Sequence, residues 1–123
     1  MIVFPAIDLK DGRVVRLVKG AFDTASQVAD DAVATARAFA AAGAEWVHMV
    51  DLDGARSGAR QNGGIVAAVA ATGLSVQLGG GIRSLEDLEA VFALDSRVVK
   101  TLCIEDCLHV VLAMLNSKRS ILL

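Results

Sequence analysis

The stretch SVQLGGGIRS at residues 75–84 decides the fold class, because it joins a strand to a helix through three consecutive glycines. Val76 and Leu78 alternate with polar residues, as they do in a short strand. Ser84 is a favourable helix N-cap, and acidic residues 86 and 87 follow it in the first helical turn. The stretch therefore predicts a strand, a tight glycine turn and the start of a helix.

The glycine turn also has the composition of an anion site. Gly79, Gly80 and Gly81 lack a Cβ, so the chain can take positive φ there and a ligand can approach bare N–H groups. Such a turn beside a helix N-terminus suits phosphate, and Arg83 adds a guanidinium fork. The alternative interpretation is a tight strand-to-helix turn that binds no ligand.

The composition favours parallel strands covered by alanine-rich helices, since the chain is 54% hydrophobic and 4% aromatic. Its 123 residues predict one domain with a substantial core. The formal net charge of -2 gives no reason to expect a nucleic-acid partner. We expect neither a membrane span nor a signal peptide, because no long apolar run and no basic, then apolar, N-terminus is present.

The two cysteines, Cys103 and Cys107, are four residues apart and are expected on one helix face. This spacing does not favour a disulfide, and no further cysteine or nearby histidine pair completes a zinc set. We interpret them as packing thiols in a reducing compartment, which predicts a cytoplasmic protein without a metal site.

Four strand-then-helix units follow one another along the chain. Asp30 or Asp31 is expected to cap the first helix, and Gly43 to end it. We expect a hairpin-like excursion at residues 14–20, a lid-length loop at 21–29 and a polar loop at 55–62. The predicted strands are residues 1–9, 45–54, 74–78 and 97–102, and the predicted helices are residues 32–42, 63–71, 85–94 and 104–115. This order predicts an α/β fold with parallel strands and right-handed crossovers.

Polar residues gather where the predicted strands end. Asp8, Asp51, Asp53, the glycine turn and Thr101 all fall at carboxyl ends, which is where parallel α/β domains bind ligands. Taken singly, each aspartate is equally well explained as a helix cap or a loop residue.

Four blocks carry a resemblance to a known family: PAIDL at 5–9, DGRVVRL at 11–17, HMVDLDGA at 48–55 and GGGIRS at 79–84. They resemble the phosphoribosylformimino-aminoimidazole carboxamide ribotide isomerases of histidine biosynthesis. The match covers residues 1–94, whereas residues 95–123 diverge. The sister family, the cyclase subunit of imidazole glycerol phosphate synthase, usually lacks the block at 50–55. A bifunctional relative that also isomerises phosphoribosylanthranilate remains an alternative.

The resemblance implies a TIM (β/α)8 barrel, which typically runs to about 250 residues. The chain is then a single half-barrel domain of four βα units over residues 1–123. The family rearranges an aminoaldose to an aminoketose without cofactor or metal. Asp8 corresponds to its general base, which takes the proton next to the Schiff-base carbon. The matching general acid ends the fifth strand, and residues 119–123 resemble only the start of that strand.

The same resemblance implies where the substrate binds. The glycine turn would hold one of two phosphates, and the second phosphate would lie on the seventh and eighth strands. The further substrate-binding residues that we expect are Asp51, Arg83, Thr101, Lys19 and Gly20. One departure is Lys100, which stands where the family typically has a phosphate-binding glycine.

Two hypotheses follow for this chain: half of an isomerase, or a phosphate-binding half barrel without turnover. Both predict a phosphorylated small-molecule partner and a homo-oligomer. The first and fourth strands are expected to be open edges, and the strand face toward the barrel interior to be one apolar patch. Two copies related by a two-fold axis would cover both.

Overall fold

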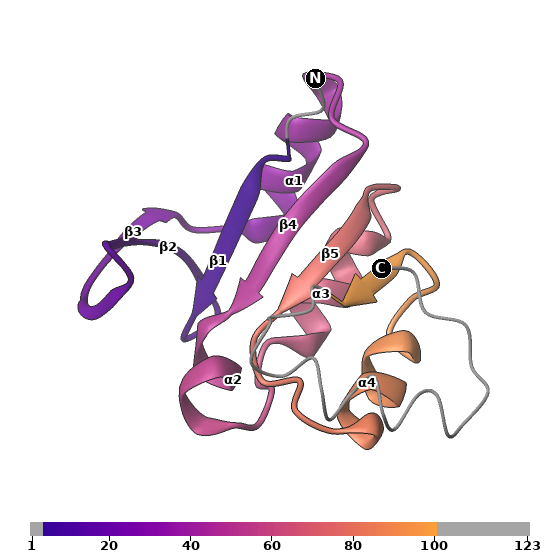
Figure 1. Cartoon of the computed structure of the whole chain (residues 1–123). Helices are drawn as coiled ribbons and strands as arrows, with labels where there is room; N and C mark the ends of the chain where they lie inside the picture. The colour runs from indigo at the N-terminus through magenta and orange to yellow at the C-terminus, as the bar shows by residue number, and fades with distance from the viewer. Residues whose placement is uncertain (1–3, 101–123) are drawn as a thin grey trace.

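The computed structural model describes residues 4–100, with Lys100 described by its backbone only. Figure 1 shows a twisted sheet with four helices. The strands are β1 (Ala6–Lys10), β2 (Arg13–Val18), β3 (Ala21–Ala29), β4 (Trp46–Asp51), β5 (Ser75–Gly79) and β6 (Val98–Lys100). The helices are α1 (Ala32–Ala41), α2 (Leu52–Ser57), α3 (Gly63–Ala70) and α4 (Leu85–Phe92).

The six strands form one mixed sheet in the order β3-β2-β1-β4-β5-β6. Strands β1, β4, β5 and β6 are parallel, as the sequence predicts, whereas β2 and β3 are antiparallel. The α/β class is confirmed, and the expectation of an all-parallel sheet is wrong. The cause is two tight turns, each with positive φ: Asp11 and Gly12 at 51° and 75°, and Lys19 and Gly20 at 51° and 75°. Turns of this hand match the twist of a hairpin.

The prediction of a loop at residues 21–29 is also wrong, because these residues form β3 against β2. Thr24 supports this hairpin, since its hydroxyl oxygen accepts from the Val18 N–H at 2.9 Å. Every residue of β3 is exposed or half-buried, so the strand lacks the alternation of buried apolar residues by which sequence reveals strands. The hairpin covers β1 along Asp8–Lys10, which corrects the expectation that this edge is entirely open.

The predicted helices at 32–42, 63–71 and 85–94 are confirmed as α1, α3 and α4. Asp31 caps α1 by accepting from the Val33 and Ala34 N–H groups at 2.8 and 3.1 Å. Ser84 caps α4 in a reciprocal capping box with Asp87. Helix α2 was not expected, because residues 52–57 read as a strand end and a polar loop.

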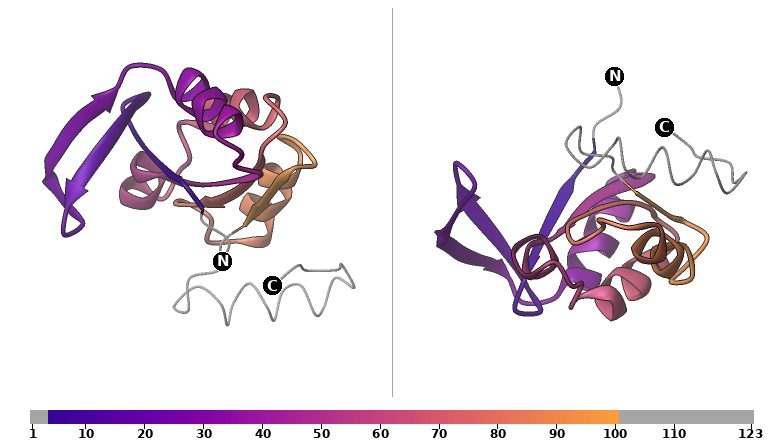
Figure 2. Two further views of the ribbon diagram at one scale, coloured as in Figure 1. Left: turned by 90° about the horizontal axis from the view of Figure 1, so that it is seen from above. Right: turned by 60° about the horizontal axis from the view of Figure 1, so that its bottom comes forward.

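The core lies between the sheet and its helices. Helices α1 and α3 lie on one side of the curved sheet (Figure 2). Apolar side chains from alternate strand positions are fully buried beneath them, among them Ile7, Leu9, Val47, Met49, Val76 and Leu78. This alternation fixes which strand residues point to the other face.

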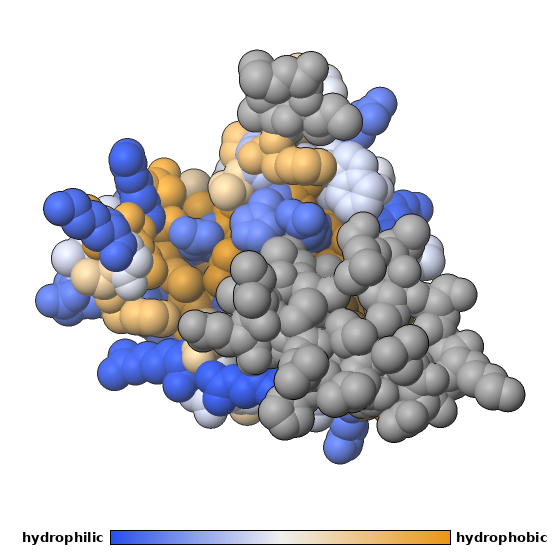
Figure 3. Space-filling model, in the orientation of Figure 1, coloured by the Kyte–Doolittle hydropathy of each residue, from blue (hydrophilic) through white to orange (hydrophobic). Residues whose placement is uncertain are grey.

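The other face of the sheet is mixed rather than apolar, which corrects the expectation of one apolar patch. It carries Asp8 from β1, His48 from β4, and Ser75 and Gln77 from β5, all half-buried. Figure 3 shows hydrophilic and hydrophobic side chains interspersed on the part of this face that it displays. The strands are apolar on average, but their alternate positions on this face include polar residues.

The predicted helix at residues 104–115 lies outside the described residues, as do Thr101, Cys103 and Cys107. Across residues 4–100, none of the helices has both the length and the apolar character that crossing a membrane requires.

Candidate functional site

Asp8 and the glycine turn meet at the carboxyl edge of the parallel strands. The register pairs Asp8 with Val50 across β1 and β4, and Val50 with Gly79 across β4 and β5. All three are half-buried on the face of the sheet opposite helices α1 and α3, which we call the open face. The structure thus brings the expected base and the first glycine of the turn into one row across three strands, with a single residue between them.

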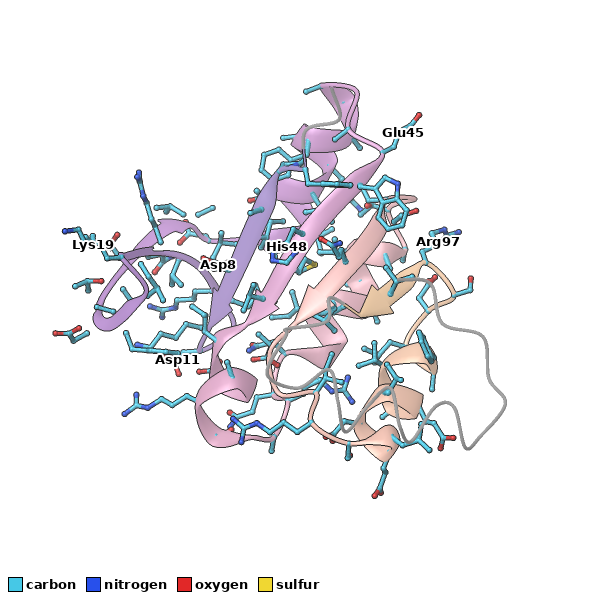
Figure 4. The ribbon with its side chains drawn as sticks, viewed as in Figure 1. Asp8, Asp11, Lys19, Glu45, His48 and Arg97 are labelled. Atoms are coloured by element: carbon cyan, nitrogen blue, oxygen red, sulfur yellow. The ribbon has the colours of Figure 1, made fainter. Side chains whose placement is uncertain are left out.

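Burial raises the pKa of the Asp8 carboxyl above its ordinary value of 3.8, and the nearby charge of His48 acts in the opposite direction. Figure 4 shows the two side chains next to each other on β1 and β4. A carboxylate with a raised pKa is a stronger base at neutral pH than an ordinary aspartate. The environment of Asp8 therefore suits proton abstraction.

His48 is the neighbour that sequence reasoning missed as a functional candidate. Its Nδ1 lies 3.0 Å from the Gln77 side-chain oxygen on β5. The alternation with buried Val47 and Met49 places His48 on the face of Asp8, and this signal was available from the sequence.

The three glycines of the turn have different reasons to be glycine. A Cβ on Gly80 would lie 2.2 Å from the Asp51 carbonyl oxygen, and one on Gly81 would lie 2.9 Å from the Gly54 Cα. Both residues have positive φ, 95° and 72°. Gly79 has open space where its Cβ would be, because no atom of residues 4–100 lies within 4 Å. Packing against Asp51 and Gly54 thus accounts for two of the glycines, and the space beside Gly79 is the part of the turn that can admit a ligand.

The N-terminus of α4 already holds an anionic group. The N–H groups of Arg83 and Ser84 both donate to one Asp87 carboxylate oxygen at 3.0 Å. The hydrogen bond from the Arg83 N–H is the main cause that lowers the pKa of Asp87, against a smaller opposing effect of burial. The N–H groups of Arg83 and Ser84 are therefore already used by Asp87 and are not the ones that a phosphate at this turn would bind.

The Arg83 guanidinium lies against α2. Its Nη2 donates to the Ala55 carbonyl oxygen at 2.9 Å, and its Nη1 lies 2.8 Å from where a Cβ on Gly58 would stand. In this arrangement Arg83 ties the start of α4 to the end of α2.

Asp51 is 1% exposed, and both of its carboxylate oxygens accept hydrogen bonds. Oδ1 accepts from the Gly54 N–H and the Asn62 amide at 2.9 and 2.8 Å, and Oδ2 from the Gln61 and Asn62 N–H groups at 2.9 and 3.0 Å. Burial acts to raise the pKa of Asp51, but these hydrogen bonds together lower it below 3.8. Asp51 therefore stays ionised and holds the loop after α2 in place.

Asn62 extends this network and was not singled out from the sequence. Its amide nitrogen donates to Asp51 and also to Asp53, in each case at 2.8 Å. The same Asp53 oxygen accepts from the Asp11 N–H at 2.8 Å. The turn between β1 and β2 is thereby connected to α2, so the carboxyl edge is a continuous hydrogen-bonded structure.

The remaining expected residues lie elsewhere. Lys19 and Gly20 form the exposed tip of the β2–β3 hairpin, away from Asp8 (Figure 4). Thr101 lies outside the described residues. A cavity of about 330 Å³ holds none of the expected site residues and is lined by Gly12, Asp30, Asp31, Ala32, Val33, Gly64, Ile65 and Ala68. Among residues 4–100, no group of three or more metal-ligating side chains could hold an ion.

The sheet order and the polar carboxyl edge define a mostly parallel α/β protein of the kind that binds ligands at its strand ends. The chain belongs to the family described as histidine biosynthesis protein, whose family model matches residues 2–118. This match confirms the resemblance that the four sequence blocks carry.

Curated relatives of the chain are named as isomerases, and the chain spans about two fifths of their length. A relative from Maricaulis maris is 57% identical over 93 residues, which cover 76% of this chain and 38% of the relative. It is named 1-(5-phosphoribosyl)-5-((5-phosphoribosylamino)methylideneamino)imidazole-4-carboxamide isomerase. Relatives with the same name from Sinorhizobium fredii and Moorella thermoacetica are 57% and 50% identical, over 72% and 80% of this chain and 37% and 42% of theirs.

Proposed function

We propose that this chain forms the first half of a TIM-barrel isomerase, as four βα units, and supplies the general base and one phosphate site. The observation that carries the proposal is the row Asp8–Val50–Gly79, which sets a carboxylate with a raised pKa on the same sheet edge as the glycine turn, two strands from Gly79. The substrate that we propose is the one in the relatives' name, an imidazole carboxamide ribotide with two phosphoribosyl groups.

The reaction is an aminoaldose-to-aminoketose rearrangement. Once the ribose ring has opened to a protonated Schiff base, the Asp8 carboxylate removes the proton from the adjacent carbon. The released electron pair forms a carbon–carbon double bond, and the electrons of the C=N bond move to nitrogen. A proton is then added to the former Schiff-base carbon, and the hydroxyl on the carbon that Asp8 deprotonated loses its proton, which gives the ketone. Asp8 needs to be ionised for this step, so activity is lost in acid at a pH above that of an ordinary aspartate.

We assign the phosphate to the space beside Gly79, with Gly80 and Gly81 holding the turn against Asp51 and Gly54. Asp51 and Arg83 then act as positioning residues, because their charged groups bind backbone of the same edge. For Lys19, Gly20 and Thr101 the substrate contact stays a prediction.

An assay of the chain with and without the complementary half of the barrel separates this proposal from its alternatives. The chain would be assayed alone and mixed with a polypeptide comprising the remaining part of the Maricaulis maris relative. We expect binding of the bis-phosphorylated aminoaldose in both cases and turnover in the mixture. Binding without turnover in either case would favour the non-catalytic phosphate-binding module, and turnover of phosphoribosylanthranilate as well would favour the bifunctional relative.

A further inference from the structure

Three polar side chains from neighbouring strands follow one another across the open face: Asp8, His48 and Gln77. His48 and Gln77 are direct partners in the register of β4 and β5. Asp8 lies two residues along β1 from Ala6, the partner of His48. All three side chains are half-buried. His48 therefore lies between a carboxylate and an amide, and Figure 4 shows it beside Asp8.

The contact with Gln77 restricts where the imidazole proton can be. His48 Nδ1 lies 3.0 Å from Gln77 Oε1, and an amide oxygen can only accept a hydrogen bond. A hydrogen bond between these two atoms requires a proton on Nδ1. In the neutral ring, Nε2 is left as the unprotonated nitrogen.

We propose that Gln77 is a positioning residue that holds His48 in its Nδ1–H tautomer, so that Nε2 is the nitrogen that gains and loses a proton next to Asp8. The link to catalysis rests on the proposed role of Asp8, whereas the tautomer itself does not. Protonation at Nε2 leaves the Gln77 bond in place and adds a positive charge beside the Asp8 carboxylate. Such a charge favours the ionised form that a general base needs.

Packing alone gives no reason for an amide at this position. The core side of β5 is filled by Val76 and Leu78, whereas Gln77 is half-buried on the opposite face. An apolar side chain of similar length would fill the same space without a polar group to desolvate. Its hydrogen bond to His48 distinguishes Gln77 from such a residue.

Nuclear magnetic resonance of the ring nitrogens tests the proposal directly. The chain of 123 residues contains two histidines and would be labelled at both, with His109→Gln used to assign His48. At a pH where the ring is neutral, we expect the Nδ1–H tautomer of His48 in the unmodified chain. Gln77→Met keeps the length but removes the acceptor, so the Nδ1–H signature should be lost. Gln77→Glu restores an acceptor and should retain it.

Ser75→Ala, on the same face of β5, is the matched control and should leave the tautomer unchanged. A Nε2–H tautomer in the unmodified chain would overturn the proposal, as would a Gln77→Met variant that keeps the Nδ1–H signature. If Gln77→Met no longer melts cooperatively, the spectra of the unmodified chain and of Gln77→Glu decide. Asp8→Asn should leave the tautomer unchanged, so a failure of the proposed function and a failure of this inference are seen separately.

Discussion

At the scale of single residues, Asp8 and Asp51 lie on the neighbouring strands β1 and β4, and their surroundings shift the carboxyl pKa in opposite directions. Burial raises the pKa of Asp8, whereas hydrogen bonds lower the pKa of Asp51 although burial opposes them. Divergent pKa values in one site commonly separate a reactive group from a structural one. Here the difference supports the proposed proton transfer by Asp8 and a loop-positioning role for Asp51.

Asp8→Asn should make the fold slightly more stable at neutral pH. The folded state binds the Asp8 proton more tightly than the unfolded chain does. The stability contributed by the protonated carboxyl is therefore full below pH 3.8 and is lost as the pH rises through the raised pKa of the folded state. Asparagine removes the buried charge, and we expect a gain of up to about 1 kcal/mol, discounted because the carboxylate is partly hydrated. Denaturant unfolding at neutral and acid pH measures it. A variant less stable than the parent at neutral pH would contradict this reading.

Asp51→Asn should be strongly destabilising. The new amide would place a donor against N–H groups that now donate to the carboxylate, which costs about 2–4 kcal/mol for a buried site. The loss should shrink as the pH falls below 3.8, because Asp51 stabilises the fold only while it is ionised. Urea unfolding measures the change, with Asp23→Asn on exposed β3 as the control. Equal destabilisation by the two variants would count against the Asp51 network.

At the scale of elements, the turn between β5 and α4 combines packing with ligand access. Gly80→Ala should prevent folding or shift the turn, because its Cβ meets a backbone oxygen at 2.2 Å and its φ is positive. Gly79→Ala should fold normally, since its Cβ meets no atom of the described part of the chain. We nevertheless expect weaker phosphate binding in Gly79→Ala, by about 10-fold or more, because the methyl group occupies the ligand's space. Calorimetric titration with inorganic phosphate measures this, and an unchanged affinity would make the turn purely structural.

Several of the elements that the sequence predicted correctly have strong periodicity or a cap. Helix α4 has Ser84 and an amphipathic face, and β4 and β5 alternate between buried and half-buried residues. Strand β3 escaped prediction because both its faces are largely solvated. Helix α2 escaped because Asp51 both ends a strand and caps a helix, so a single acidic residue marks two elements at once.

Part of the candidate site was also predictable from the sequence. Asp8 and the glycine turn could be placed at one edge because parallel strands bring their carboxyl ends together. The bonds of Arg83 to α2 and of Asn62 to two aspartates depend on loops whose path no local pattern specifies. The position of His48 on the face of Asp8 was predictable from the alternation of residues along β4. Its hydrogen bond to Gln77 could be found only once the register of β4 and β5 was known.

At the scale of the whole molecule, the 123-residue chain by itself should self-associate. Among residues 4–100, β6 has a strand neighbour only at β5, and the half-buried open face carries no covering helix layer. Phe4 and Phe92 add exposed apolar surface, at 44% and 42%. Such edges and surfaces favour pairing of copies. Sedimentation at micromolar concentration should show a dimer or larger species, and a sharply melting monomer would contradict the expectation.

The central claim, that Asp8 removes the proton next to the Schiff-base carbon, is tested most directly by isotope exchange. The bis-phosphorylated aminoaldose would be incubated in deuterated solvent with the chain and its complementary half. Deuterium uptake at that carbon would be followed in the remaining aminoaldose, because the same carbon is the ketone carbon of the product and carries no hydrogen there. We predict uptake with the parent chain and a loss of about 100-fold or more with Asp8→Asn, while substrate binding persists. Undiminished uptake by an Asp8→Asn variant that still binds substrate would contradict the account.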